Sequence, residues 1–261
     1  MRTENALRRK LEAGETVLGA SCATFSPTVI ETMGHLGLDY VWLDLEHAGP
    51  SPSDSTALEE LTRAAEAADV DLLVRLPAPD PPVVRKVLDA GVRTILLPRI
   101  ETADQLRRGV RAAYFSYDGD VGDRGVGVGR SAEWVGYGDE FVAGEDEEVL
   151  VGTMIENQRA VDDIDEILSV PQLGFAFVGP ADLSMSLSAG DPTADTSEAV
   201  ESAIDRTLAA CLDAGVPLGR IRNDIESART AMDAGYRIVR IGGDVSSIHA
   251  TVGSRLDRLS E

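Results

Sequence analysis

The chain has few aromatic residues, two cysteines and no long apolar segment. Phe, Trp and Tyr make up 5% of its 261 residues, so a buried core must consist mostly of Val, Leu, Ile and Ala. Cys22 and Cys211 are too few for a disulfide framework and fit no zinc motif, so we expect reduced structural thiols. No apolar run approaches the ~18 residues of a membrane span, and residues 1–15 do not resemble a signal peptide. We therefore expect a cytoplasmic protein.

Negative charge dominates the chain, and lysine is almost absent. Asp and Glu number 45 against 24 Lys and Arg, which gives a formal net charge of -21. Nucleic acids and anionic membranes require a basic surface, so neither is an expected partner. Lys10 and Lys86 are the only lysines. This acidic, lysine-poor composition indicates a halophilic protein in a salt-rich cytoplasm, where screening offsets self-repulsion.

Short apolar segments alternate with segments of helical periodicity along the chain. The expected strands are 17–22, 39–44, 71–76, 94–98, 149–155, 173–178, 217–221 and 237–242. Helices are expected at 55–69, 80–90, 101–113, 158–169, 196–214 and 224–234. Eight strands alternating with helices in about 250 residues predict a single (β/α)8 TIM barrel over residues 1–261. The alternative is a doubly wound sheet, but residues 21–28 lack the glycine-rich phosphate-binding turn expected after its first strand.

Three of the expected helices end in the same Asp-Ala-Gly triplet. Its glycines are Gly91, Gly215 and Gly235, each shortly before an expected strand. Glycine is favoured there because a helix C-terminus commonly closes with a left-handed residue. The triplets therefore support the predicted helix boundaries.

Residues 114–148 interrupt the alternation with a segment rich in Gly, Asp and Arg. Long loops inside compact domains are usually functional or disordered. We expect this loop to lie at the active-site end of the barrel. Arg124 and Arg130 would then be placed to bind an anionic substrate.

Two carboxylates follow neighbouring strands of the predicted barrel. Glu156 comes after strand 149–155, and Asp182 after strand 173–178. Each alone is equally consistent with a helix N-cap or a surface charge. Together, at the end where such barrels carry their active sites, they form a hard oxygen site suited to Mg²⁺ or Mn²⁺. Water and substrate oxygens would complete the coordination.

The second and third predicted strands also end in ionisable residues. Asp44 stands three residues before His47 and is expected to fix its tautomer, giving a pair suited to proton transfer. Arg75 offers a bidentate fork to a carboxylate or enolate. His35 and His249 lie in helix-like segments and are expected to be structural.

The positions of the lysines argue against one type of mechanism. An imine-forming enzyme needs a desolvated lysine inside its site. Lys10 belongs to an N-terminal helical segment, and Lys86 lies in the middle of the expected helix 80–90. Neither stands at a strand end, so metal-stabilised enolate chemistry is favoured.

At these positions the chain resembles the HpcH/HpaI family of class II pyruvate aldolases. The motifs that carry the resemblance are ordered and spaced as in the family and cover nearly the whole chain. They are Asp44-Leu45-Glu46-His47-Ala48, Val74-Arg75-Leu76-Pro77, Leu88-Asp89-Ala90-Gly91, Arg124-Gly125-Val126-Gly127, Ile155-Glu156 and Gly179-Pro180-Ala181-Asp182-Leu183-Ser184-Met185-Ser186.

The resemblance implies a barrel whose C-terminal helix packs on a neighbouring subunit, in a hexamer built from dimers. It implies Glu156 and Asp182 as ligands of Mg²⁺, Mn²⁺ or Co²⁺. It further implies that Arg75 holds the pyruvyl oxygens and polarises the carbonyl, while His47 with Asp44 handles protons.

The resemblance also implies a substrate-binding set. Backbone amides from Gly179 through Pro180 and Ala181 to Asp182 would cradle the carboxylate. Asp89 would reach a partner subunit's site and help to discriminate the aldehyde, and the matched Arg124 would belong to the same substrate-binding set.

Three departures from the family pattern leave the substrate open. Leu45 stands where members commonly have Gly, and Met154 replaces a Gln two positions before the metal-binding Glu. Residues 117–120 read Tyr-Asp-Gly-Asp in place of the usual Tyr-Pro-Pro. The metal-binding and arginine positions are unaffected.

Three functions are therefore to be weighed. The first is reversible cleavage of a 4-hydroxy-2-oxo acid to pyruvate and an aldehyde. The second is a lyase acting on citramalyl-CoA or malyl-CoA, which the acidic surface disfavours because a nucleotide needs basic residues. The third is a non-catalytic binding barrel, disfavoured because the main chemical positions are filled.

Overall fold

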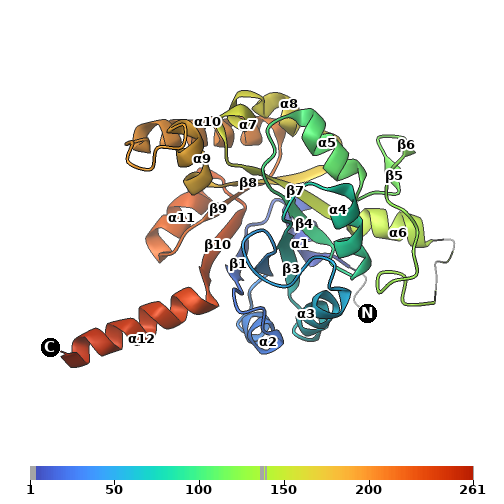
Figure 1. The fold of residues 1–261 in the computed structure, drawn as a ribbon, viewed down its shortest axis with the longest axis horizontal. Coiled ribbons are helices and arrows are strands. Elements are labelled where there is room, and N and C mark those ends of the chain that lie inside the picture. The colour runs from blue at the N-terminus through green and yellow to red at the C-terminus, as the bar shows by residue number, and fades with distance from the viewer. Residues whose placement is uncertain (1–3, 136–137, 139, 261) are drawn as a thin grey trace.

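The computed structural model describes residues 4–135, 138 and 140–260. Within them, parallel strands close an eight-stranded barrel in the order β1-β10-β9-β8-β7-β4-β3-β2, with helices outside (Figure 1). The strands are β1 (Val17–Ser21), β2 (Tyr40–Asp44), β3 (Asp71–Arg75), β4 (Thr94–Leu97), β7 (Leu150–Ile155), β8 (Leu173–Val178), β9 (Leu218–Ile221) and β10 (Ile238–Gly243). The (β/α)8 prediction is confirmed, and the open doubly wound sheet is excluded.

The helices follow the predicted alternation with three differences. They are α1 (Ala6–Glu12), α2 (Pro27–His35), α3 (Ser55–Ala67), α4 (Pro81–Asp89), α5 (Ala103–Arg111), α6 (Phe141–Glu148), α7 (Gln158–Asp162), α8 (Ile164–Leu168), α9 (Pro180–Leu187), α10 (Ser197–Ala214), α11 (Ile225–Ala234) and α12 (Asp244–Ser260). The helix predicted at 158–169 is divided at Asp163, whose carboxylate accepts the N–H of Ala103 at 3.0 Å. Neither α6 nor α9 was predicted, and the two-residue strands β5 (Ser116–Tyr117) and β6 (Asp120–Val121) form a small hairpin.

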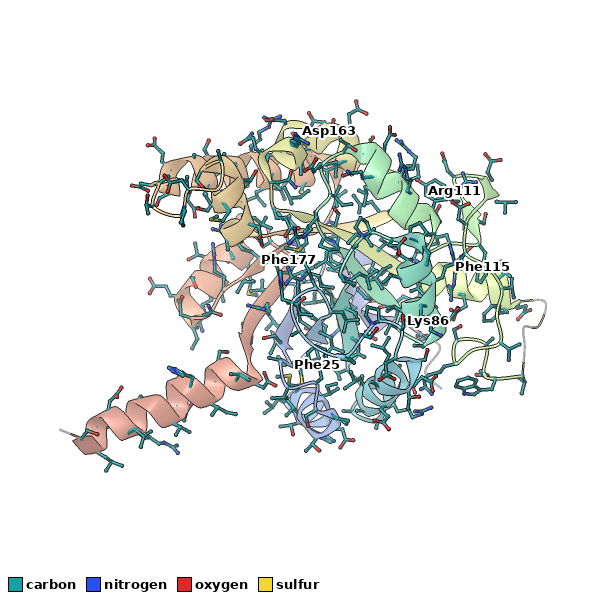
Figure 2. The ribbon with its side chains drawn as sticks, in the orientation of Figure 1. Phe25, Lys86, Arg111, Phe115, Asp163 and Phe177 are labelled. Carbon is teal, nitrogen blue, oxygen red and sulfur yellow. The ribbon has the colours of Figure 1, made fainter. Side chains whose placement is uncertain are left out.

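The inside of the barrel is filled by large side chains opposite glycines. A Cβ atom at Gly19 would lie 2.4 Å from the Tyr40 ring, and one at Gly219 would lie 2.1 Å from the Phe177 ring. Figure 2 shows Phe177 among the central strands. The glycines therefore give the aromatic rings room inside a closed barrel, which is a packed core and not a pore.

The N-terminal end of the barrel is closed by α1. Leu7 and Leu11 of this helix join the interior core, and the Asn5 side chain donates to Thr94 Oγ1 at 2.9 Å. Lys10 pairs with Asp39 beside the same end. The carboxyl ends of the strands remain the open end, so Lys10 lies away from it.

The glycines of the three Asp-Ala-Gly triplets adopt the left-handed backbone conformation at helix ends, as predicted. Gly215 and Gly235 are the C-caps of α10 and α11, with φ of 69° and 109°. Gly91, just after α4, has φ of 95°. Only glycine adopts these angles without steric cost, so the three boundaries follow from local sequence.

The last helix leaves the barrel. In Figure 1, α12 extends away from the other elements, and none of its residues is buried. Its exposed apolar residues are Val245, Ile248, Val252, Leu256 and Leu259. No helix in the described part of the chain is both long and apolar enough to cross a membrane.

Candidate active site

A cavity of about 330 Å³ opens at the carboxyl ends of the strands. Its apolar lining includes Trp42, Met154, Phe177 and Ile221. The ionisable residues that line it are Asp44, His47, Arg75, Asp182 and Arg240. Most of the predicted site residues therefore surround one volume, at the end where parallel barrels carry their chemistry.

Arg75, at the end of β3, is held by two carboxylates at the end of the neighbouring strand β2. It is paired in register with Asp44 of β2, whose carboxylate accepts from Nε at 2.9 Å and from Nη2 at 2.5 Å. Its Nη1 lies 3.0 Å from Oε2 of Glu46. A guanidinium carries five N–H donors, so donors remain for a ligand in the cavity. The bidentate pair fixes the direction in which they point.

The Asp44–Arg75 pair stays ionised. Burial tends to raise the pKa of Asp44, but its hydrogen bonds and charge interaction with Arg75 outweigh burial and lower it. Burial tends to lower the pKa of Arg75, but Asp44 and then Glu46 raise it. The site therefore keeps a fixed positive charge with attached carboxylates.

His47 lines the cavity, and its imidazole faces Glu46, while only its backbone bonds to Asp44. The Asp44 carboxylate accepts from Arg75 and from the backbone N–H of Glu46 at 3.0 Å. The imidazole Nε2 instead faces Oε2 of Glu46 at 3.6 Å, and the side chain is 54% exposed. The neighbouring arginine therefore occupies the aspartate side chain, and a role for Asp44 in fixing the tautomer of His47 stays a prediction. His47 retains access to the cavity and to solvent.

Glu156 presents an unpartnered carboxylate oxygen. It follows β7 and is 4% exposed, and its Oε1 accepts the backbone N–H of Arg99 at 2.6 Å. Oε2 is buried without a hydrogen-bond partner. Burial raises the pKa of Glu156 despite the bond from Arg99. The charges of Glu46 and Asp182 raise this pKa further, so several carboxylates share this region.

The chemistry of this region fits a divalent cation. A buried carboxylate oxygen without a partner is costly unless a proton, donor or cation satisfies it. Asp182 lies close enough for its charge to act on Glu156. No group of three or more Asp, Glu, His or Cys side chains within the described residues could hold a metal alone. Two carboxylates completed by water and substrate oxygens match Mg²⁺, which keeps several non-protein ligands.

The start of α9 forms one wall of the cavity. Gly179, Pro180, Ala181 and Asp182 all line it. Pro180 occupies the first turn, where a missing N–H costs nothing, and Leu183 donates to the Gly179 carbonyl at 3.0 Å. A Cβ at Gly179 would lie 3.0 Å from Oε2 of Glu156, so glycine lets the carboxylate approach. The N–H groups of this helical turn suit an anionic ligand.

The sequence matches a known family over most of its length. A family model described as HpcH/HpaI aldolase/citrate lyase covers residues 21–250. The chain belongs to this HpcH/HpaI aldolase/citrate lyase family. It is therefore an aldolase, a carbon–carbon lyase, and the reading as a non-catalytic barrel is set aside.

Relatives in the HpcH/HpaI family are similar over nearly the whole chain. A hydroxypyruvate/pyruvate aldolase from Paraburkholderia phytofirmans is 32% identical, covering 92% of each chain. A 4-hydroxy-2-oxovalerate aldolase from Novosphingobium aromaticivorans is 30% identical, covering 98% of this chain and 95% of that one. A crystal structure of a family protein from Burkholderia cenocepacia J2315 superposes with a TM-score of 0.87 at 33% identity, covering 98% and 100%.

Two predicted substrate-binding residues of this HpcH/HpaI chain lie at the opposite end of its barrel. Asp89 is the last residue of α4, and its carbonyl accepts the Ser131 N–H at 3.2 Å. Arg124 is buried, with its Nη2 2.8 Å from Oε2 of Glu145 and its guanidinium carbon 4.7 Å from the Phe115 ring centroid. Neither lines the cavity beside Arg75 in its own chain.

The expected location of the 114–148 loop is therefore wrong. Because α5 runs back along the barrel after β4, the chain that follows it starts at the N-terminal end of the strands. Arg130 is engaged there with Glu66 at 2.5 Å. Residues 136, 137 and 139 of the loop lie outside the described residues.

Several residues in or next to the cavity were not assigned a role from the sequence. Trp42 and Arg240 point into the barrel, Cys22 lines the cavity from the end of β1, and Arg99 supplies a backbone donor to Glu156. Only Trp42 could have been found from the sequence. It lies two residues before Asp44 in the same strand, so both side chains are expected on the same face.

Proposed function

We propose that this protein is a divalent-metal-dependent aldolase that reversibly cleaves a 4-hydroxy-2-oxo acid to pyruvate and an aldehyde. The observation that carries the proposal is the unpartnered Oε2 of Glu156, buried behind Gly179 of the cavity wall. The charge of Asp182, which lines the cavity with Arg75, acts on this carboxylate. Glu156 and Asp182 would hold Mg²⁺, Mn²⁺ or Co²⁺. When bound, the cation supplies Lewis-acid stabilisation of the enolate. Relatives named for pyruvate, hydroxypyruvate and 4-hydroxy-2-oxovalerate support a 2-oxo acid.

Arg75 binds the oxo acid and stabilises negative charge that develops on its oxygen. Asp44 holds the guanidinium before the substrate arrives, so little reorganisation is needed during the reaction. The partial burial of the pair strengthens its electrostatic effect. The first-turn amides of α9, at Ala181 and Asp182, orient the carboxylate of the same molecule.

His47 handles the proton of the 4-hydroxyl group. Its Nε2 accepts that proton directly or through one water during cleavage and returns it in the aldol direction. Its 54% exposure allows exchange of the proton with solvent. Glu46, 3.6 Å from Nε2, stabilises the imidazolium that forms.

A neighbouring subunit completes the aldehyde side of the site. Asp89 lies far from the cavity of its own chain, so it would reach substrate only across a subunit interface, in a hexamer built from dimers. Arg124 is fully buried against Glu145, so it would act there only by supporting the face that carries Asp89. The exposed apolar residues of α12 support such an assembly. A groove of about 330 Å³ beside β10 and α11 is lined by apolar residues and would receive the partner's α12; they include Leu18, Ile225, Ala228, Met232 and Ile241.

The whole chain would act as one catalytic domain in a salt-rich cytoplasm. The net charge of -21 keeps such a protein soluble where salt screens repulsion between its carboxylates. Activity and thermal stability that rise between low and molar potassium chloride would support this part of the proposal.

Release of pyruvate from 4-hydroxy-2-oxo acids tests the main proposal. Activity should disappear after treatment with EDTA and return with Mg²⁺, Mn²⁺ or Co²⁺. Glu156→Gln should remain folded but inactive at any metal concentration, whereas Glu201→Gln, at an exposed position of α10, should match the wild type. Full activity after thorough metal removal would refute the proposal. Cleavage of malyl-CoA or citramalyl-CoA in place of free acids would favour the thioester lyase.

A further inference from the structure

The cavity contains a second arginine that the aldolase mechanism does not use. Arg240 lies in β10, next to β1 and β9, and its side chain lines the same cavity as Arg75. Both guanidinium groups flank Trp42: the Arg240 Cζ lies 5.8 Å from the ring centroid and the Arg75 Cζ lies 5.9 Å from it. The cavity therefore presents two positive groups beside one indole.

Arg240 has no hydrogen bond or ion pair with a carboxylate among the described residues, although the charge of Asp44 acts on it from a longer distance. Its Nε is buried without a hydrogen bond, and its side chain enters no ion pair there. The neighbouring Tyr40 hydroxyl is also buried and unpartnered. Burial lowers the pKa of Arg240, which reflects the cost of holding this charge away from water. An arginine placed in this way favours an anion that enters from the cavity.

The other charges that line the cavity already have roles. Asp44 is paired with Arg75, and His47 faces Glu46. Asp182 belongs with Glu156 to the proposed cation site. Among the described residues, Arg240 has no carboxylate in an ion pair with it, and Asp44 acts on it only at longer range. The place beside its guanidinium is therefore open to an anion of the ligand.

We propose that Arg240 binds a second carboxylate of the substrate, which makes the preferred substrates dicarboxylic 2-oxo acids. This inference rests on the proposed function, in which the first carboxylate and the oxo group lie at Arg75 and α9. The cavity of about 330 Å³ is at the small end of ligand pockets and suits a short diacid. The second carboxylate extends toward β10 and meets the guanidinium beside Trp42.

A structural role for Arg240 makes different predictions. Stacking on Trp42 contributes a cation–π interaction but leaves Nε without an acceptor. If stacking is the whole role, Arg240→Met lowers stability and leaves ligand preference unchanged. If the ligand supplies the anion, Arg240→Met removes an uncompensated buried charge, so the unliganded protein keeps or gains stability.

Calorimetric binding of matched acids to the magnesium-loaded protein tests the inference. The probes are 2-oxoglutarate against 2-oxopentanoate and oxaloacetate against 2-oxobutanoate, which pair acids of equal chain length. The wild type should bind each diacid at least ~10-fold more tightly than its monoacid, as a desolvated charge pair provides. Arg240→Met should abolish this preference without weakening monoacid binding, and Arg240→Lys should retain part of it.

Arg222→Met is the matched control, because Arg222 follows the adjacent strand but does not line the cavity. It should keep the diacid preference. Equal binding of diacids and monoacids by the wild type would overturn the inference, as would a preference that survives Arg240→Met. Binding requires no turnover, so a protein that prefers diacids through Arg240 yet releases no pyruvate would refute the proposed aldolase reaction and leave this inference standing.

Discussion

The backbone N–H of Arg99 donates to Oε1 of Glu156 at 2.6 Å from a residue whose φ is 56°. That angle is left-handed and sterically unfavourable for arginine. The Arg99 side chain also pairs with Glu46, with Nε 2.7 Å from Oε1. A strained turn after β4 therefore fixes Oε1 of Glu156 by a hydrogen bond. The other oxygen, Oε2, stays free for the proposed cation.

Substitution of Arg99 should reveal this strain. Arg99→Gly and Arg99→Ala both lose the contact with Glu46 and keep the backbone donor, but only glycine relieves the left-handed angle. We expect the glycine variant to be more stable than the alanine variant by about 1 kcal/mol. Urea unfolding of the two metal-free proteins measures the difference. Equal stabilities would show that the turn is not strained.

Gly179→Ala should weaken metal binding. Its new Cβ would meet the Glu156 Cβ at 2.8 Å and Oε2 at 3.0 Å, so the carboxylate must move. We expect the dissociation constant for Mn²⁺, measured by calorimetry, to rise by about 10-fold or more, since ligand positioning of this kind costs one to two orders of magnitude. Gly144→Ala is the control, because its Cβ would meet no atom within 4 Å. An unchanged affinity in Gly179→Ala would remove Glu156 from the metal site.

Asp244 should make stability depend on pH at the acid end. Its carboxylate accepts from the N–H groups of Ala23 and Val245 and from the N–H and hydroxyl of Thr24. Burial tends to raise its pKa, but these bonds, led by the Thr24 hydroxyl, lower it. A pKa lower in the folded than in the unfolded state adds stability above the unfolded value, and this is lost as pH falls through the folded value.

Asp244→Asn is therefore expected to cost about 1 kcal/mol at pH 7, a figure reduced for solvent exposure. The difference from the wild type should shrink as pH falls below ~4, where both unfolded and folded carboxyls become protonated. Urea unfolding from pH 3 to 7 in molar salt measures it. A difference that is the same at every pH would assign the effect to side-chain shape and not to charge.

Neither thiol should react rapidly in the folded protein, and Cys211 should not react at all. Burial raises the pKa of Cys211 to about 12, so at pH 8 only about one thiol in ten thousand is ionised. Burial also raises the pKa of Cys22, which lines the cavity. With Cys22→Ser, we expect no reaction with Ellman's reagent at pH 8 until denaturant is added. In Cys211→Ser, slow labelling of Cys22 should be blocked by pyruvate with Mg²⁺. Rapid labelling of Cys211 would contradict its burial.

The fold and the positions of the two proposed metal-binding carboxylates were predictable, because short-range sequence patterns determine them. Apolar runs locate the strands, and the Asp-Ala-Gly triplets end helices at Gly91, Gly215 and Gly235. The positions of Glu156 and Asp182 then follow from the barrel, since adjacent strands end side by side. No long-range contact has to be known to reach this point.

Side-chain partners were less predictable, because they depend on which side chains the strand register places next to one another. Asp44 was assigned to His47 three residues away, but the register of β2 and β3 places Arg75 directly beside it. Arg240 gave no signal, since β10 carries arginine and apolar residues without a clear alternation. The position of the 114–148 loop was predictable, because a helix after β4 returns the chain to the opposite end.

In the proposed assembly, the protruding helix α12 would make part of the secondary structure sensitive to protein concentration. A single helix of 17 residues with no buried side chain is marginally stable in water. Diluted monomers should therefore lose helical circular dichroism from this segment before the barrel unfolds, and recover it as subunits associate. The far-ultraviolet spectrum would then report assembly, with no label attached to the chain.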